Sequence, residues 1–290
     1  MPNLNKITPY IFLQNQSKKQ RGITNNKSFQ FISRWSTSLA LSLCLTTSLG
    51  TIAKAQTPET IPPQLNQVLT QIDAAANRQD VSAVENLYGD NFVNSDNLNR
   101  TAMLAGLRQF WGRYSQLNYT TNLESWNQEG NQIVAETVTV ITGVQELEER
   151  EINLESTLRS RQYILDGQIV RQEILAESTR LFLGENPPQL EVRLPDEVSP
   201  GQEYGFDAIV TEPLGGDLLI GGAIDEPVNS DRYLNPGNIE LNVLPAGGIF
   251  KIGKAPTEAV DQWLSAIVIR GDGITVVSQR LRVVDNVSRR

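Results

Sequence analysis

The chain has 290 residues, of which 39% are hydrophobic and 20% charged, a composition typical of a globular protein longer than one ordinary domain. Residues 1–55 hold seven basic side chains and no acidic one, which leaves 18 of the 25 basic residues against all 33 acidic ones, a net charge of −15. An acidic chain of this kind repels phosphate backbones and anionic lipid. We therefore expect no nucleic-acid partner.

The first 55 residues have the pattern of an export signal. An uncharged apolar stretch at residues 35–52 is followed by Ala53-Lys54-Ala55, a small-x-small site of the type that signal peptidase accepts. The alternative is a retained membrane anchor, but the Leu-rich centre is shorter than the ~20 apolar residues of a bilayer span. We expect cleavage after Ala55, a location in the bacterial periplasm or outside the cell, and no stable membrane anchor afterwards.

Cleavage after Ala55 would also remove the single cysteine, Cys44, and the chain has no histidine. The mature protein then has no disulfide, no thiolate nucleophile, no Ser-His-Asp triad and no ordinary zinc site. Neither a P-loop nor a dinucleotide fingerprint occurs, so we expect no cofactor. We expect no metal site either, although carboxylates alone could hold calcium or magnesium.

The first part of the mature chain, after an extended lead-in at residues 56–63, combines helices with strands. Apolar side chains three and four apart predict a helix from residue 65, Asp80 caps a second one, and a third spans about residues 101–114. From Asn118 the apolar period changes to two, which predicts four long antiparallel strands. Because such a sheet must bury one face, residues 64–186 predict an α+β domain with a curved, cone-like sheet.

The second part has strand character only. Asn186-Pro187-Pro188 breaks the earlier pattern and marks the predicted domain boundary. Residues 188–285 then contain seven short strand-like runs, separated by turn signals such as Ser199-Pro200-Gly201. This pattern predicts an all-β sandwich of immunoglobulin-like size, without the cysteine pair of a true immunoglobulin domain, and a tail at residues 286–290.

One sequence phrase in the first domain resembles a known superfamily. The segment from Asp80 to Asp96 contains Asp-x-x-Ala-x-x-x-Leu-Tyr-x-Asp-x-Phe and, with the helix and strand order of residues 64–184, is similar to the nuclear transport factor 2-like superfamily. This group includes ketosteroid isomerases and SnoaL-type cyclases. The resemblance implies the cone-like fold and a homodimer. It implies no single function, because the superfamily includes enzymes, ligand binders and protein-interaction modules.

The same resemblance implies one candidate catalytic residue. Aligned without gaps, the general-base carboxylate of the ketosteroid isomerases falls on Asp96 and the oxyanion-donating tyrosine on Ile72. Counted back from the Gly167 turn, the protonated aspartate falls near Arg159. An aspartate in a loop also commonly bonds its own backbone. We favour this structural role for Asp96, and on that basis expect Asp96→Asn to change stability by no more than about 1 kcal/mol.

Five further side chains are candidates for a ligand pocket. Three are aromatic and could equally fill the core: Tyr88, Trp111 and Trp126. The other two, Arg159 and Arg161, share one face of a strand, where they could receive an anionic ligand or pair with glutamates of the neighbouring strands. We favour ion pairing, for which the sequence offers Glu136, Glu155, Glu173 and Glu177.

Two classes of function follow. The favoured class is an exported, non-catalytic protein that binds a small apolar or amphipathic ligand, or another protein. The alternative is a SnoaL-like isomerase, cyclase or hydrolase in which Asp96 is the general base and Arg159 or Tyr88 stabilises developing negative charge.

Overall fold

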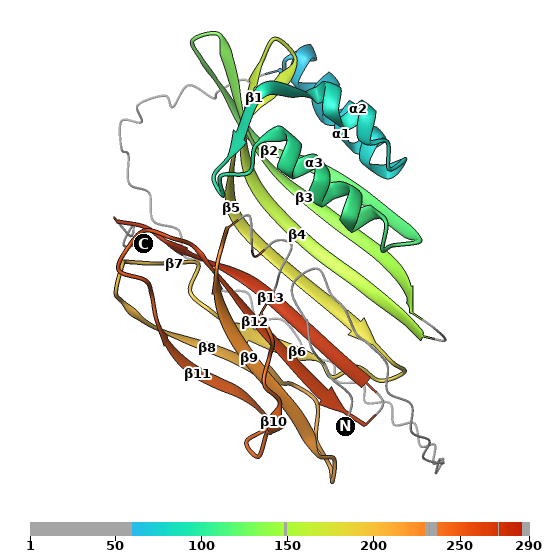
Figure 1. The fold of residues 1–290 in the computed structure, drawn as a ribbon, viewed down its shortest axis with the longest axis vertical. Coiled ribbons are helices and arrows are strands. Elements are labelled where there is room, and N and C mark those ends of the chain that lie inside the picture. The colour runs from blue at the N-terminus through green and yellow to red at the C-terminus, as the bar shows by residue number, and fades with distance from the viewer. Residues whose placement is uncertain (1–59, 148–149, 230–231, 233–236, 272, 286–290) are drawn as a thin grey trace, which may run out of the picture. The chain divides into compact units, whose positions relative to one another are not determined.

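The computed structural model describes residues 60–147, 150–229, 232, 237–271 and 273–285. The predicted export signal with Cys44, most of the lead-in and the tail at 286–290 lie outside these residues. From Ile61 onward the described residues belong to one compact unit. This part is mostly β-sheet with few helices (Figure 1).

The helices of the described part are α1 (Pro63–Asn77), α2 (Val81–Leu87) and α3 (Arg100–Trp111). Asp80 caps α2 as predicted, because its side chain accepts a hydrogen bond of 3.0 Å from the Ala83 N–H. α3 ends earlier than expected, at Trp111, where Gly112 is the C-terminal cap residue. Within the described ranges, no helix is long and apolar enough to cross a bilayer.

Five strands belong to the first part of the chain: β1 (Tyr88–Asn94), β2 (Gln116–Glu129), β3 (Gln132–Leu147), β4 (Arg150–Leu165) and β5 (Gln168–Leu183). β2 to β5 are the four predicted antiparallel strands. The hairpin between β4 and β5 turns at Asp166 and Gly167, whose φ angles of 50° and 79° are those of the expected tight turn. β1 was not predicted, since it is short and pairs in parallel with β5, far along the chain.

The remaining strands are β6 (Leu190–Arg193), β7 (Glu197–Val198), β8 (Glu203–Val210), β9 (Leu219–Pro227), β10 (Asn242–Val243), β11 (Gly248–Lys254), β12 (Gln262–Arg270) and β13 (Gly273–Val283). They do not form a self-contained pair of sheets. β13 pairs with β5 over six residues. One ten-stranded sheet therefore has the order β10-β9-β12-β13-β5-β4-β3-β2, with β1 beside β5 and β7 beside β13. β11, β8 and β6 form a separate three-stranded sheet. The edge pairing satisfies backbone groups that both β5 and β13 would otherwise leave open.

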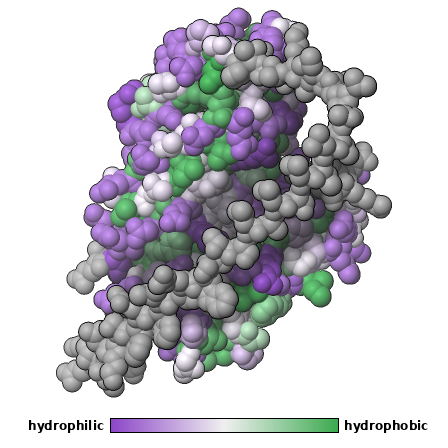
Figure 2. Space-filling view, turned by 180° about the vertical axis from the view of Figure 1, so that it is seen from behind, coloured by the Kyte–Doolittle hydropathy of each residue, from purple (hydrophilic) through white to green (hydrophobic). Residues whose placement is uncertain are grey.

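Two apolar clusters lie in the described part. The first contains buried side chains of α1–α3, β1 and β3–β5, and it continues into the second part of the chain through Ile267 and Val276. The second lies between the large sheet and the three-stranded sheet, around Phe206 and Leu264. Figure 2 shows a mixed surface on the side opposite to that of Figure 1, with hydrophobic residues scattered among hydrophilic ones. Because Ile267 and Val276 belong to it, the first apolar cluster contains side chains from both parts of the chain.

The Asn186–Pro188 segment is packed against β13. Thr275 donates a hydrogen bond of 2.6 Å to the Pro188 carbonyl, and a Cβ atom at Gly273 would lie 2.1 Å from the Asn186 carbonyl oxygen. Only glycine allows this close approach of two backbones. The segment that connects the two parts of the chain is therefore held against β13 of the large sheet.

Candidate functional site

A cavity of about 570 Å³ lies between the three helices and the sheet face that they cover. Its apolar wall comes largely from the helices, with Ile72 on α1 and Met103, Leu107 and Phe110 on α3. α3 also lines it with small residues, and a Cβ atom at Gly106 would have no other atom within 4 Å. The volume is in the range of small-molecule sites, about 300–1,000 Å³.

Below this cavity the sheet has a floor of hydrogen-bonded polar side chains. Gln162 Nε2 donates to Thr137 Oγ1 at 3.2 Å, Thr137 and Ser160 share a hydrogen bond of 3.3 Å, and Gln172 Nε2 donates to Ser160 Oγ at 3.3 Å. Gln162 and Gln172 line the cavity, and Gln162 is only 5% exposed. Buried polar groups cost free energy unless they are satisfied, and Gln162 Oε1 is buried with no hydrogen-bond partner among the described residues.

One row of the sheet crosses the cavity wall from strand to strand. Thr121 is opposite Thr139, which is opposite Leu158, which is opposite Glu177. At the β2 end of this row, Asp73 of α1 accepts hydrogen bonds from the Thr121 N–H at 2.8 Å and the Thr121 hydroxyl at 2.6 Å. Asp73 thereby fixes α1 to the sheet, and Glu177 is the carboxylate at the other end of the row.

The aromatic residues of the wall are neutral hydrogen-bonding groups. Trp111 Nε1 donates to Tyr119 Oη at 2.8 Å. Burial raises the pKa of Tyr88 to about 12 and also raises the pKa of Tyr119 well above its ordinary value. Both phenols are therefore protonated at neutral pH.

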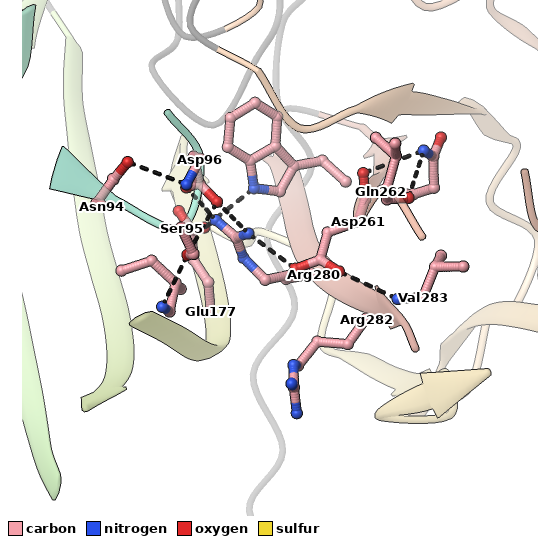
Figure 3. Close-up of polar contacts among 12 residues, drawn as sticks. Asn94, Ser95, Asp96, Glu177, Asp261, Gln262, Arg280, Arg282 and Val283 are labelled. Atoms are coloured by element: carbon pink, nitrogen blue, oxygen red, sulfur yellow. Dashed lines mark hydrogen bonds and ion pairs between the residues drawn. The ribbon is translucent and has the colours of Figure 1, made fainter. Parts of the chain in front are cut away.

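A buried arginine next to the cavity joins the two parts of the chain (Figure 3). The Arg280 side chain, on β13, is 0% exposed and binds Asp96 with both ends of its guanidinium group, at 2.9 and 2.8 Å. Arg280 Nη2 also contacts Glu177 Oε2 at 3.1 Å, and Nη1 contacts Asp261 Oδ2 at 3.1 Å. We refer to Arg280, Asp96, Glu177 and Asp261 as the Arg280 cluster.

Asp96 accepts a hydrogen bond of 3.3 Å from Ser95 Oγ in its own loop, but its main contact, with Arg280, was not expected. The loop backbone is bonded by Asn94, whose side chain accepts from the N–H groups of Asp96 at 3.0 Å and of Leu98 at 2.8 Å. Asp96 is 6% exposed, is not part of the cavity lining, and has both carboxylate oxygens on Arg280. No local pattern indicates this contact, since Arg280 lies 184 residues away along the chain.

The structure separates the five pocket candidates. Tyr88 and Trp111 line the cavity, whereas Trp126 packs against the first apolar cluster and does not line it. Arg159 and Arg161 also lie outside the cavity lining.

The two arginines form the ion pairs that we favoured. Arg159 contacts Glu124 at 2.7 Å and Glu136 at 2.9 Å, and Arg161 contacts Glu136 at 2.7 Å and Glu173 at 3.0 Å. The hydrogen bond from Arg161 lowers the pKa of Glu136. A ligand at these arginines would have to displace their carboxylates.

The sequence placed Glu177 on the wrong face of the sheet. Glu173 and Glu177 are four residues apart, so a regular strand would turn both to one side. The pairing of β4 with β5 shifts at Arg159 and Ser160, and Glu177 then lines the cavity while Glu173 pairs with Arg161 on the other side. Bulges of this kind are not visible in a single sequence.

Among the residues that the structure describes, no group of three potential ligands is placed to hold a metal ion. The carboxylates of the Arg280 cluster converge on a guanidinium group.

Comparisons with known proteins address the two parts of the chain separately. Residues 185–284 match a family described as a domain of unknown function, DUF8623. A search of curated proteins finds no match. Solved structures are similar to part of the chain at low identity.

Three of these structures illustrate the likeness. A proposed scytalone dehydratase from Novosphingobium aromaticivorans is 12% identical, with 38% of this chain and 80% of that one covered and a TM-score of 0.33. An LEH-like epoxide hydrolase of M. tuberculosis is 14% identical, with 37% of this chain and 78% of that one covered and a TM-score of 0.27. A protein with a ketosteroid isomerase-like fold from Catenulispora acidiphila, in complex with trimethylamine, is 11% identical, with 37% of this chain and 83% of that one covered and a TM-score of 0.28. Likenesses this weak carry no argument about function.

Proposed function

We propose that this protein is an exported, non-catalytic binder of a small amphipathic molecule, which occupies the cavity under α1–α3. The observation that carries the proposal is the cavity itself, about 570 Å³ with apolar helix side chains on one side and a polar floor on the other. Sites for small molecules have this composition, in which apolar surface supplies affinity and a few polar groups fix orientation. The expected export signal supports the location.

The contacts of Asp96 favour a binder over an enzyme. The general base that the resemblance implied is held by Arg280 and does not line the cavity. A general base must come within hydrogen-bond reach of the proton that it removes. Asp96 would first have to leave Arg280, and the buried guanidinium would lose a bidentate partner.

A cavity-filling variant tests the proposal. Leu158 lines the cavity from the middle of β4, so Leu158→Trp should fill part of it. The neighbouring Thr157 is exposed and points to the opposite side of the strand, which makes Thr157→Trp the matched control. Adamantanol, a compact neutral alcohol, serves as the probe, and its binding is measured by calorimetry and by the shift in melting temperature.

We expect adamantanol to bind and stabilise the wild type and Thr157→Trp, and to lose most of its effect in Leu158→Trp. A ligand at about 100 times its dissociation constant stabilises a protein by about 2.7 kcal/mol, which a melting experiment resolves. Absence of binding to the wild type, or equal binding to all three proteins, would contradict the proposal. N-terminal sequencing of the exported protein tests the location, and we expect it to begin at Gln56.

A further inference from the structure

Glu177 is a carboxylate of the cavity lining, and its hydrogen-bond donors belong to the second part of the chain. It lines the cavity from β5, and its Oε2 atom accepts hydrogen bonds from Trp263 Nε1 at 3.0 Å and Arg280 Nη2 at 3.1 Å. Both donors belong to the second part, on β12 and β13. Glu177 Oε1 accepts no hydrogen bond from the described residues. One oxygen is therefore fixed by two donors, and the other has no donor among the described residues, while Glu177 lines the cavity.

The surroundings of Glu177 disfavour an anion. Its partner Arg280 also contacts Asp96 and Asp261, so that three carboxylates share one guanidinium group. An anionic group that approached Glu177 would meet like charge in a partly buried site, where such repulsion is strong. A carboxylate is also an acceptor only, and it pairs best with a charged or neutral donor.

The other polar groups of the wall do not reverse this preference. Asp73 is itself a carboxylate, with both oxygens bonded to Thr121. Arg113 is the cationic residue among the described residues of the lining. The next residue, Tyr114, has its ring 3.2 Å from the Cβ position at Gly143 on β3. β3 is two strands from β5, or about 10 Å at the usual strand spacing.

We propose that the ligand of this cavity has a hydrogen-bond donor as its polar group, an amine or an alcohol, and that Glu177 Oε1 receives it. Arg280 and Trp263 act as positioning residues, because they hold the carboxylate without lining the cavity. The inference rests on the proposed function, since it assigns a polar group to the molecule that the cavity binds.

Matched probes test this assignment. Adamantanamine, adamantanol and adamantane carboxylate have the same apolar body, and at neutral pH they are a cation, a neutral molecule and an anion. We expect the wild type to bind the amine and the alcohol at least about tenfold more tightly than the carboxylate, the scale of one charge-assisted hydrogen bond. In Glu177→Gln the amine should lose about tenfold in affinity, while the alcohol changes little.

Glu173→Gln is the control, because Glu173 is on the same strand but pairs with Arg161 on the other face. It should leave all three affinities unchanged. If adamantane carboxylate binds the wild type as well as the amine does, the assignment is wrong while the binding function stands, and this comparison needs no variant. Unchanged amine binding in a folded Glu177→Gln protein would also overturn it. Failure of all three probes to bind would refute the binding function as well.

Discussion

Replacement of Arg280 by methionine should destabilise the protein more than any other single change at a charged residue described above. The side chain is fully buried and contacts Asp96, Glu177 and Asp261, so its loss leaves buried carboxylates without this cation. Breaking a buried ion pair by removal of one partner costs about 3–5 kcal/mol. The whole stability of a folded domain is about 5–15 kcal/mol. Arg280→Met therefore removes a large share of it.

Urea unfolding measures this loss. With a slope of about 3 kcal/mol per molar urea, a loss of about 3–5 kcal/mol lowers the unfolding midpoint by about 1–2 M. The fluorescence of Trp263 is a suitable signal, because this residue is 1% exposed and bonds Glu177 within the cluster.

Arg282→Met is the control for Arg280→Met. Arg282 lies two residues further along β13 and pairs with Glu197, and both of these side chains are more than a quarter exposed. Pairs of this kind contribute about 0–1 kcal/mol. The reasoning would be refuted if the two variants had the same midpoint.

Two further predictions concern the same fold. Asp96→Asn should lower the free energy of unfolding by more than about 2 kcal/mol, against the 1 kcal/mol expected from the sequence, because an amide cannot accept a bidentate contact from Arg280. The control is Asp90→Asn, whose side chain is 87% exposed and which should change the urea midpoint little. Equal midpoints for the two variants would contradict the buried contact. The free energy of unfolding should also fall in alkali, because burial raises the pKa of both Tyr88 and Tyr114 to about 12 from 10.0. The stability that these protonated phenols contribute is complete below pH 10 and is lost as the pH rises toward 12. Tyr88→Phe should reduce the difference in unfolding free energy between pH 9 and pH 11 by about 1 kcal/mol, and an unchanged difference would show that this phenol is not protected from ionisation.

Local signals were enough to predict most of the elements. The Asp80 cap and the Asp166-Gly167 turn are where the sequence placed them, because caps and tight turns depend on residues that are neighbours in the chain. β1 was missed because its partner, β5, is distant in sequence. The joining of β5 to β13 was missed for the same reason, since an edge strand has no residue pattern that names its partner.

The candidate site was less predictable than the fold. Tyr88 and Trp111 were identified by type, but the same argument selected Trp126, which packs elsewhere. Asp96 was identified as unusual and given the wrong partner, because a buried ion pair depends on three-dimensional proximity alone. Glu177 was assigned to the wrong face, since alternation along a strand fails at a bulge.

The pairing of β5 with β13 has a consequence for the region that matches DUF8623. That region, residues 185–284, includes β13 but not β5. Expressed alone, it would present the β13 edge with a row of unsatisfied amide and carbonyl groups, a surface prone to strand addition and aggregation. In the present chain the strand that pairs with this edge is β5, which also carries Glu177 at the cavity. A chain that lost this pairing would expose the β13 edge and would also lose the placement of Glu177 next to Arg280.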